Sequence, residues 1–216
     1  MNTTAIILAA GQASRMRLEG EFKSKALLPL PYPHAERDNG PWLPALACLA
    51  QTYRQAGVHD IMLVSGYHRH ETETLARELG LMCANNSAPW AGMFSSVRTA
   101  LAAMAPCDNF FVNPVDVPLI AVDTIRSLLA QSAVQPDAVL VPVHAGEEGQ
   151  PPLIPGQYRE RILAHDGDNG LAGALQALPR MRMDVTDPFV LEDMDTPEDY
   201  ARLCRASQCR LGALHE

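Results

Sequence analysis

Short apolar runs and longer amphipathic segments alternate along the chain, with glycine, proline or polar residues between them. A short apolar run between turn residues is typical of a strand buried on both faces, whereas apolar positions three and four residues apart indicate a helix that packs on one side. The expected strands are 5–9, 60–65, 80–84, 109–113, 138–142 and 181–185. The expected helices are 43–56, 71–79, 93–104, 122–131, 157–164, 170–177 and 197–205. This alternation predicts a three-layer, Rossmann-like α/β fold, with helices on both faces of a mostly parallel sheet.

Three breaker-rich segments interrupt the alternation, at 17–24, 31–40 and 143–155. Long irregular loops in compact domains are commonly functional or disordered. Open α/β sheets bind ligands beyond the carboxyl ends of their strands, and these segments follow expected strands. We therefore expect them to border a ligand site.

Residues at the helix ends support the predicted boundaries. Gly57 and Gly80 stand where the helices before them should end, since glycine tolerates the left-handed conformation found there. Asp123 and Thr196 are expected to cap the starts of two helices, with Pro197 as the first residue of the last helix.

Composition and charge narrow the class of protein. The 216 residues are 47% hydrophobic and 19% charged, which is typical of a globular protein and predicts one domain over residues 1–216. The formal net charge of −8 argues against a general nucleic-acid binder, because such proteins hold phosphates with basic patches. The apolar runs have only strand length, so no membrane span is expected. The N-terminus lacks the features of a signal peptide, which predicts a cytoplasmic location.

The cysteines and histidines do not have the spacing of a zinc site. No C-x-x-C pair occurs, and no histidine stands at ligand spacing beside a cysteine. His68 and His70 are expected on a solvated loop. The cysteines are expected to be buried as small apolar side chains, at Cys48, Cys83, Cys107, Cys204 and Cys209.

The first expected strand runs into a loop of small residues that contains Gly11 and Arg15, and Lys25 follows. Small side chains let backbone N–H groups approach phosphate oxygens closely. Arg15 offers a forked donor and Lys25 a compact positive charge. These features point to the phosphates of a nucleotide, although a strand that ends in a glycine turn also occurs in most α/β domains.

The loop is neither of the common phosphate-binding motifs. A dinucleotide fingerprint needs glycine where Ala13 and Met16 stand, and a Walker loop needs Gly-Lys-Ser/Thr at its end. What remains is the segment L-A-A-G-x-x-S-R-M with K-A-L-L-P-L behind it.

Asp116 follows the apolar run 110–112, where a strand of a nucleotide-binding sheet is expected to end. A carboxylate at this place is a natural Mg²⁺ ligand, because Mg²⁺ takes one or two carboxylates and completes its shell with water and phosphate oxygens. The alternative is that Asp116 only forms a turn before Pro118. Because Asp116 occurs together with the first motif, we favour the interpretation that it binds a metal ion.

A second acidic element occupies 192–200. Thr196 and the acidic residues after it resemble the start of a helix. Asp193 and Asp195 are two positions apart, so in an extended segment both face the same side. Either one is suited to complete a metal site with Asp116, and the spacing does not decide between them.

The segment 90–98 combines a flexible glycine with the start of a helix. Gly92 permits a close approach, and Ser95 and Ser96 open a helix whose first N–H groups are unpaired. Serine capping alone is enough to explain this pattern, so it gains functional meaning only together with the other motifs.

These motifs occur in the order found in one enzyme family, from Ala5 to Leu203. The chain resembles the MobA-like NTP transferases, above all the molybdenum cofactor cytidylyltransferases, in L-A-A-G-x-x-S-R-M, G-M-x-x-S-V-R and D-x-D-T-P-E-D. The resemblance implies catalytic roles for Arg15, Lys25 and Asp116, and Mg²⁺ on Asp116 with Asp193 or Asp195. It implies nucleotide binding, with Arg98 as a weaker candidate, by Leu8, Ala9, Ala10, Gly11, Ser14, Arg15, Lys25, Gly92, Met93 and Ser96.

The implied reaction is nucleotidyl transfer from an NTP to a phosphorylated small molecule, with release of pyrophosphate. The L-A-A-G segment resembles the cytidylyl branch of the family, so CTP and a molybdopterin-type acceptor are expected first. A sugar, polyol or amino-alcohol phosphate remains open as the acceptor. A nucleotide-binding regulator without turnover is an alternative of another class, and a protein partner, the acceptor enzyme, also remains open.

The chain departs from the family pattern in ways that concern the acceptor most. The interval between Arg15 and Lys25 is longer than usual, and Ala13 replaces a glycine. Gln150 takes the place of a common histidine, and the segment 167–170 lacks an arginine that often follows. The donor chemistry is therefore better defined than the acceptor.

Overall fold

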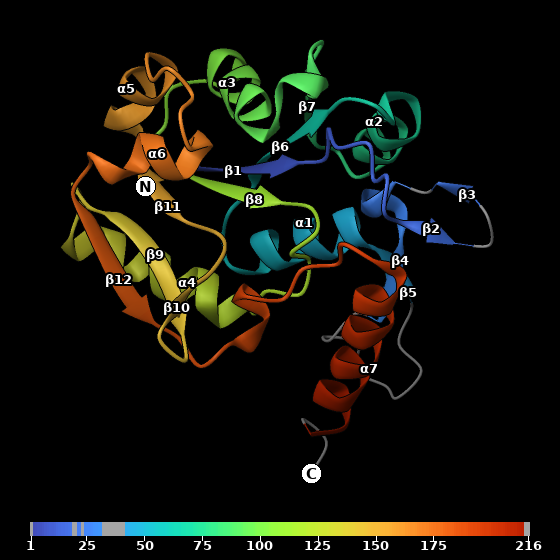
Figure 1. Cartoon of the computed structure of the whole chain (residues 1–216). Helices are drawn as coiled ribbons and strands as arrows, with labels where there is room; N and C mark the ends of the chain where they lie inside the picture. Colours follow the sequence, from blue (N-terminus) through green and yellow to red (C-terminus); the bar gives the residue numbers. More distant parts are fainter. Residues whose placement is uncertain (1, 19–20, 23, 32–41, 214–216) are drawn as a thin grey trace.

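The computed structural model describes residues 2–18, 21–22, 24–31 and 42–213. Its central sheet has the order β10-β9-β11-β8-β1-β6-β7, and β12 pairs with β9 (Figure 1). The pairs β1–β6, β1–β8, β6–β7 and β9–β12 are parallel, which confirms the expected mostly parallel sheet. The strands are β1 (Thr3–Leu8), β6 (Asp60–Ser65), β7 (Met82–Asn85), β8 (Asn109–Pro114), β9 (Val139–His144), β10 (Glu147–Glu148), β11 (Leu153–Pro155) and β12 (Arg180–Asp184).

Helices cover both faces of the sheet, as the sequence predicts. In Figure 1 α3, α5 and α6 lie on one side of β1 and β8, while α1 and α4 lie on the other. The helices are α1 (Ala45–Gln55), α2 (Arg69–Glu78), α3 (Met93–Ala103), α4 (Val122–Val134), α5 (Arg159–Leu163), α6 (Gly170–Gln176) and α7 (Pro197–Ala213). Short 3-10 turns are η1 (Lys25–Leu27), η2 (Pro89–Ala91), η3 (Gly156–Tyr158) and η4 (Pro188–Val190).

The alternation of side chains along β1 explains the three layers. Ala5 and Ile7 join one buried cluster together with residues of α1, α2 and α4. Ile6 and Leu8 point the other way and join a second cluster with residues of α3, α5 and α6. Successive side chains of a strand face opposite sides, so a strand that is apolar throughout must be covered on both faces.

Several short strand pairings were not predicted from the sequence, and two of them form small sheets of their own. β11 lies antiparallel between β8 and β9, inside the segment 143–155 that was expected to be irregular. β2 (Arg17–Leu18) pairs with β3 (Glu21–Phe22) in a hairpin within the expected loop 17–24. β4 (Pro29–Pro31) pairs with β5 (Trp42–Pro44), so α1 begins two residues later than expected. The expected interruption at 31–40 lies outside the described residues beyond its first position.

Most of the residues expected at helix ends lie there, but the last helix, α7, extends to Ala213 instead of ending at 205. Gly57 and Gly80 follow α1 and α2 with φ of +93° and +67°. The Thr196 hydroxyl accepts a hydrogen bond from the backbone N–H of Asp199, at the start of α7. The prediction for Asp123 was wrong, because α4 begins after Ala121, whose N–H donates to the carboxylate of Asp187 instead.

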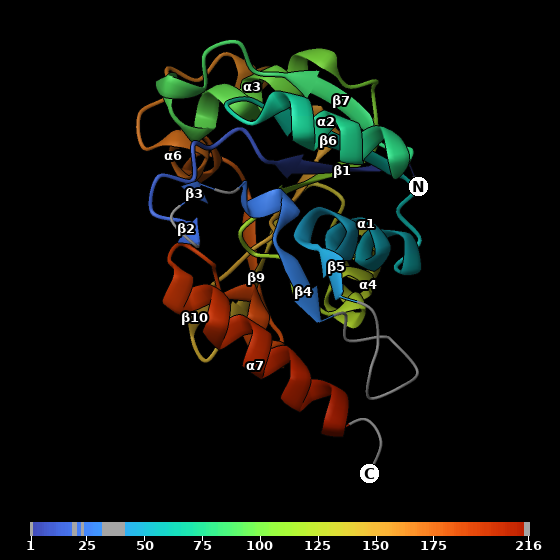
Figure 2. The same ribbon diagram turned by 90° about the vertical axis from the view of Figure 1, so that its right-hand side faces the viewer.

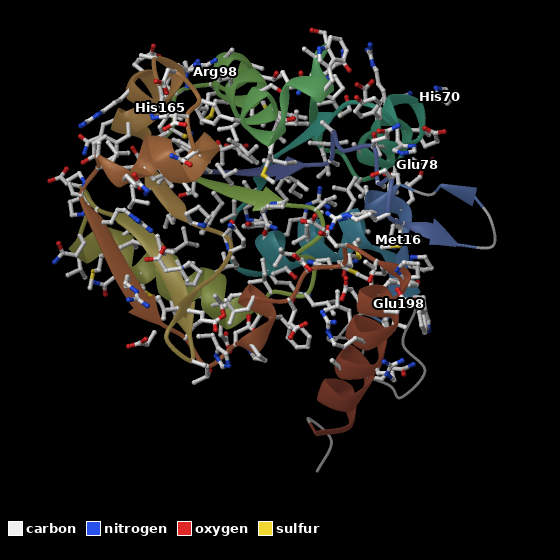
Figure 3. All side chains as sticks on the ribbon, in the orientation of Figure 1. Met16, His70, Glu78, Arg98, His165 and Glu198 are labelled. Carbon is white, nitrogen blue, oxygen red and sulfur yellow. The ribbon has the colours of Figure 1, made fainter. Side chains whose placement is uncertain are left out.

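The expectations for cysteine and histidine hold only in part. Cys48 is buried, but Cys83 is exposed, since β7 is an edge strand and this side chain points outward. His70, which is labelled in Figure 3, lies in the first turn of α2 rather than on a loop. Among the described residues, no helix is both long and apolar enough to cross a membrane.

A third buried cluster holds the loops around the sheet's carboxyl edge. Met16, Leu28 and Leu30 pack in it with Met194 and with Leu203 of α7. The Tyr200 hydroxyl donates to the carbonyl of Pro29, so α7 is fixed alongside β4 (Figure 2). This cluster brings the start of the chain and its last helix to the same place.

Candidate active site

A cleft of about 500 Å³ opens at the carboxyl ends of β1 and β8. Parallel strands deliver their following loops to one edge of the sheet, which is where ligands of open α/β sheets bind. Apart from the weaker candidate Arg98, the site residues predicted from the sequence all line this cleft: Leu8, Ala9, Ala10, Gly11, Ser14, Arg15, Lys25, Gly92, Met93, Ser96, Asp116, Asp193 and Asp195. The fold thus brings together residues from four separate parts of the chain.

The loop after β1 is held by the loop after β6. The backbone N–H of Tyr67 donates to the carbonyl of Ala10 at 3.3 Å. Gly66 lies so close to Ala10 that a Cβ on Gly66 would stand 2.6 Å from the Ala10 carbonyl oxygen and 2.7 Å from its Cβ. Only a residue without a side chain allows this approach. The backbone of the loop is therefore fixed by its neighbour rather than by its own side chains.

The rest of this loop leaves its backbone open toward the cleft. A Cβ on Gly11 would meet nothing within 4 Å, so the space beside Gly11 is free for a ligand. Ala13 has a φ of +53°, a conformation that favours glycine. Ala13 replaces the glycine usual in the family, and the structure shows why glycine suits that position.

A chain of alternating charges crosses the floor of the cleft. The Lys25 ammonium lies 3.0 Å from Oδ2 of Asp116 and 2.5 Å from Oδ1 of Asp195. A guanidinium nitrogen of Arg15 lies 2.6 Å from Oδ2 of Asp195. The Lys25 side chain is 14% exposed and that of Arg15 is 69% exposed. Lys25 is thus a mostly buried cation that is fixed by its ion pairs, whereas Arg15 extends into the cleft from the surface.

These contacts shift the titration of the groups in the cleft. Burial favours the neutral amine of Lys25, but the carboxylates of Asp116 and Asp195 outweigh it and raise its pKa above the ordinary value. Burial and the nearby charges of Asp195 and Asp116 raise the pKa of Asp193. Lys25 is therefore charged at neutral pH, and the carboxylates around it repel one another.

The donor set of the cleft fits a divalent cation such as Mg²⁺. Oxygens of Asp116 and Asp195 both lie within hydrogen-bond distance of the one Lys25 ammonium, so the two carboxylates converge on a shared space. Among the described residues no group of three or more His, Cys, Asp or Glu side chains has the geometry of a metal site. Two carboxylates suit Mg²⁺, which leaves its other positions to water and phosphate oxygens.

Asp193 occupies a different position from its neighbour. Both aspartates line the cleft on either side of the fully buried Met194, as their spacing predicts. Of the two, Asp195 forms the ion pairs with Lys25 and Arg15. This difference favours Asp195 as the partner of Asp116, a choice that the spacing leaves open.

Arg98, a weaker candidate for nucleotide binding, is not among the residues that line the cleft. Its guanidinium donates to the carbonyl of His165 and lies 5.1 Å from the centroid of the Phe94 ring. In Figure 3 Arg98 is labelled on α3, and His165 is labelled to its left, toward α5 and α6. Arg98 therefore joins α3 to the turn between α5 and α6. Trp90 is 73% exposed on η2.

A second cavity of about 530 Å³ adjoins the cleft and shares Gly92, Met93, Pro114 and Gln150 with it. Most of its walls are apolar, and they include Phe94, Val112, Val141, Leu171 and Leu175. Its polar groups include Glu148 and Arg180, which form an ion pair at 2.5 Å. The two cavities together provide room for two ligands side by side.

Sequence reasoning missed several residues of the cleft. Ser24 and Pro89 line it, and both adjoin motif residues, which was the available signal. Gln150 also lines it, at the place where the family has a histidine. Asn86 lies behind the wall of the cleft and contacts Ser96. No spacing rule singles out this asparagine, which follows Asn85 at the end of β7.

Comparison with known proteins follows this geometry. The MobA-like NTP transferase domain family matches residues 5–182. A solved nucleotidyl transferase from Methanothermobacter is 21% identical, with a TM-score of 0.74, over 95% of this chain and 97% of that one. Rv0371c from Mycobacterium tuberculosis is 22% identical, with a TM-score of 0.71, over 95% and 99%. It has also been solved in complex with manganese.

A more distant structure is similar over the same range. The molybdopterin-guanine dinucleotide biosynthesis protein A from Archaeoglobus fulgidus is 14% identical, with a TM-score of 0.65, over 94% of this chain and 97% of that one. At such identities the solved structures show a common fold, which confirms the predicted Rossmann-like nucleotidyltransferase architecture. No curated protein sequence matches this chain.

Proposed function

This chain belongs to the MobA-like NTP transferase family of nucleotidyltransferases, and on that premise we propose that it transfers CMP from CTP to a phosphorylated acceptor of the molybdopterin type. The observation that carries the proposal is the position of Lys25 between Asp116 and Asp195, in the cleft that the open backbone at Gly11 also lines. A nucleotide-binding regulator without turnover does not require a lysine fixed between two carboxylates. This arrangement therefore disfavours the regulator as the alternative function.

In the proposed reaction a phosphate oxygen of the acceptor attacks the α-phosphorus of the nucleotide. A new P–O bond forms, the bond between the α-phosphorus and its bridging oxygen breaks, and pyrophosphate leaves. Such a transfer needs in-line placement and neutralisation of charge rather than a protein nucleophile. The amides of 11–14 and Arg15 hold the triphosphate, and Lys25 stabilises the negative charge that develops on the phosphates.

Binding of the triphosphate requires a change of partners for both cations. In the structure Arg15 and Lys25 are paired with Asp195. Phosphate oxygens then take over these donors, and the released carboxylates of Asp116 and Asp195 are free to hold Mg²⁺. When bound, Mg²⁺ supplies charge neutralisation on the phosphate oxygens. The complex of Rv0371c with manganese supports a divalent cation in this fold.

The acceptor is proposed to occupy the second cavity. Its apolar walls at Phe94, Val141 and Leu171 suit a flat ring system better than the many hydroxyl groups of a sugar or polyol. The Glu148–Arg180 pair offers donors and acceptors at the edge of the cavity. A sugar, polyol or amino-alcohol phosphate is the alternative acceptor, favoured by Gln150 in place of the histidine common in the family.

A pyrophosphate-release assay tests the proposal. Each of the four NTPs is offered with Mg²⁺ and with acceptors of the molybdopterin, sugar-phosphate and polyol-phosphate classes. We expect release of pyrophosphate with CTP and the molybdopterin-type acceptor. Release of pyrophosphate with a sugar phosphate instead would contradict the proposed acceptor but would support nucleotidyl transfer. Binding of nucleotide without release for any acceptor would favour the regulator.

A further inference from the structure

Asn86 lies between β7 and η2, outside all of the motifs, and its side chain is almost fully buried at 4% exposed. Its Oδ1 accepts a hydrogen bond of 2.9 Å from the backbone N–H of Ala88. A backbone N–H can only donate, so this contact fixes which end of the amide is the oxygen. The NH₂ group of Asn86 must therefore face the opposite way, toward α3.

The NH₂ group of Asn86 donates to the hydroxyl oxygens of two successive serines. The distances are 2.7 Å to Ser95 and 2.9 Å to Ser96. Ser95 donates its own proton to the carbonyl of Gly92 at 2.7 Å. Among the described residues, none accepts the hydroxyl proton of Ser96. The amide thus donates to two serine hydroxyls. The hydroxyl proton of Ser95 already has an acceptor, whereas that of Ser96 remains available to a ligand.

Ser96 is 3% exposed and lines the nucleotide cleft together with Gly92 and Met93. A buried hydroxyl that accepts one hydrogen bond and donates none leaves a polar group unsatisfied, which costs stability unless a ligand supplies the acceptor. The charged cluster that suits the triphosphate has its two cations in the segment after β1, and its carboxylates lie after β8 and just before α7. Ser96 comes from α3 instead, on a wall available to the nucleoside.

We propose that Asn86 is a positioning residue that makes the Ser96 hydroxyl a donor to the nucleoside of the bound NTP. By occupying a lone pair of the Ser96 oxygen, the amide directs the free proton away from itself and toward the cleft. The ligand atom that receives this proton is an acceptor on the base or on the ribose. This inference rests on the proposed function, since it assumes that the cleft binds a nucleotide.

The variant Asn86→Asp tests the proposal without a change in side-chain size, because it replaces the donor of both serine contacts by an acceptor. In Asn86→Asp a carboxylate oxygen replaces the NH₂ group, so Ser96 must donate to position 86 and turns a lone pair toward the ligand. We expect KM for CTP to rise about tenfold, the order expected for one lost hydrogen bond, while kcat stays within about twofold. Ser96→Ala should raise KM by a similar factor, because it removes the donor.

The double variant separates positioning from a general structural role. If Asn86 acts through Ser96, adding Asn86→Asp to Ser96→Ala changes KM no further. Ser95→Ala is the matched control: this serine contacts the same amide, but its proton is already bound by Gly92, so KM should stay unchanged. Multiplied effects in the double variant, or an equal effect of Ser95→Ala, would overturn the proposal.

Isothermal titration of CTP and of 2′-deoxy-CTP with Mg²⁺ supplies a second readout. A loss of affinity in Ser96→Ala that occurs with both nucleotides places the acceptor on the base or on a ribose oxygen other than the 2′-hydroxyl. A loss with CTP alone places it at the ribose 2′-hydroxyl, and either result supports the proposal. No loss with either nucleotide overturns it.

Two further checks keep the test interpretable. Thermal unfolding shows whether Asn86→Asp folds, and Asn86→Ala replaces it if not, with a rise in KM that should vanish in the Ser96→Ala background. A wild type that binds none of the four NTPs contradicts the proposed function itself. A wild type that binds CTP as tightly as the variants at 86 and 96 contradicts only the positioning role.

Discussion

The ammonium of Lys25 lies 2.5 Å from Oδ1 of Asp195, although 170 positions separate the two residues in the chain. The contact depends on the buried cluster in which Met194 and Leu28 pack together, because this cluster carries the start of α7 to the loop after β1. Lys25 therefore pairs with two carboxylates before any ligand arrives. A triphosphate must compete with Asp195 for the same cation.

Replacement of Lys25 by alanine should reduce turnover far more than stability. The lost ammonium would otherwise stabilise charge on the phosphates, and loss of one such contact commonly lowers kcat about 100-fold or more. Steady-state kinetics with CTP, beside thermal unfolding, measures both effects. Arg126→Ala is a control, since it removes an exposed cation paired with Asp123 on α4. A folded Lys25→Ala enzyme with wild-type kcat would contradict the catalytic role.

Asp116→Asn should weaken the dependence on Mg²⁺. A neutral amide is a poorer ligand than a carboxylate for a hard cation, so half-maximal activity should require more Mg²⁺ than in the wild type. Titration of activity against Mg²⁺ compares the two proteins directly. Asp193→Asn should shift this midpoint less, because Asp193 takes no part in the ion pairs that join Asp116 to Asp195. Superimposable curves for Asp116→Asn and wild type would contradict metal binding by Asp116 and would favour the alternative that it only forms a turn.

Asp193→Asn should stabilise the metal-free protein at neutral pH. Burial and the charges of Asp195 and Asp116 raise the pKa of Asp193 in the folded state. The unfolded chain then loses this proton at lower pH than the folded one, so ionisation of Asp193 opposes folding above the ordinary pKa of aspartate. The variant removes this penalty.

Melting temperatures measured with a chelator along a pH series check this sign. The excess stability of Asp193→Asn should be full near neutral pH and should disappear as the pH falls below the ordinary pKa of aspartate. Asp123→Asn, which changes an exposed carboxylate on α4, is the control for the loss of one negative charge elsewhere on the protein. If the excess stability of Asp193→Asn instead grows as the pH falls, the pKa of Asp193 is lowered by folding and the prediction is wrong.

Gly66→Ala and Gly11→Ala should separate stability from binding. A Cβ at position 66 would stand 2.6 Å from the Ala10 carbonyl oxygen, whereas one at position 11 meets nothing within 4 Å. Overpacking of this kind costs about 1–3 kcal/mol, so Gly66→Ala should unfold at lower denaturant concentration. Gly11→Ala should keep wild-type stability and weaken CTP binding, because its methyl group enters the phosphate space. Equal stability of the two variants would contradict this account.

Base preference should depend on the loop at Ala10. The wild type is expected to prefer CTP over GTP, and Ala10→Gly is expected to narrow that difference by enlarging the base pocket. A single methyl group in a pocket is worth about 1–3 kcal/mol, so the preference is strong but not absolute. In the structure the Ala10 methyl also faces Gly66, so it can act by setting the position of the loop. Values of kcat/KM for both nucleotides decide, and a wild type that prefers GTP would contradict the cytidylyl assignment.

The three-layer fold followed from the sequence because burial on both faces leaves a periodic trace. β1 is apolar at every position from Ala5 to Leu8, and such a run requires helices above and below it. β11 left no such trace. Leu153–Pro155 is too short for a periodic signal, and its place between β8 and β9 depends on pairing with strands from elsewhere in the chain.

The sequence by itself determined which side chains are available for the chemistry and that they follow the strands of one sheet edge. Only the tertiary structure decided their partners: Lys25 pairs with Asp116 and Asp195, while Arg98 turns away to His165. It also revealed Asn86 behind Ser96. The physical reason is that local spacing fixes the face on which a side chain lies, whereas contacts across many positions depend on how the separate elements pack together.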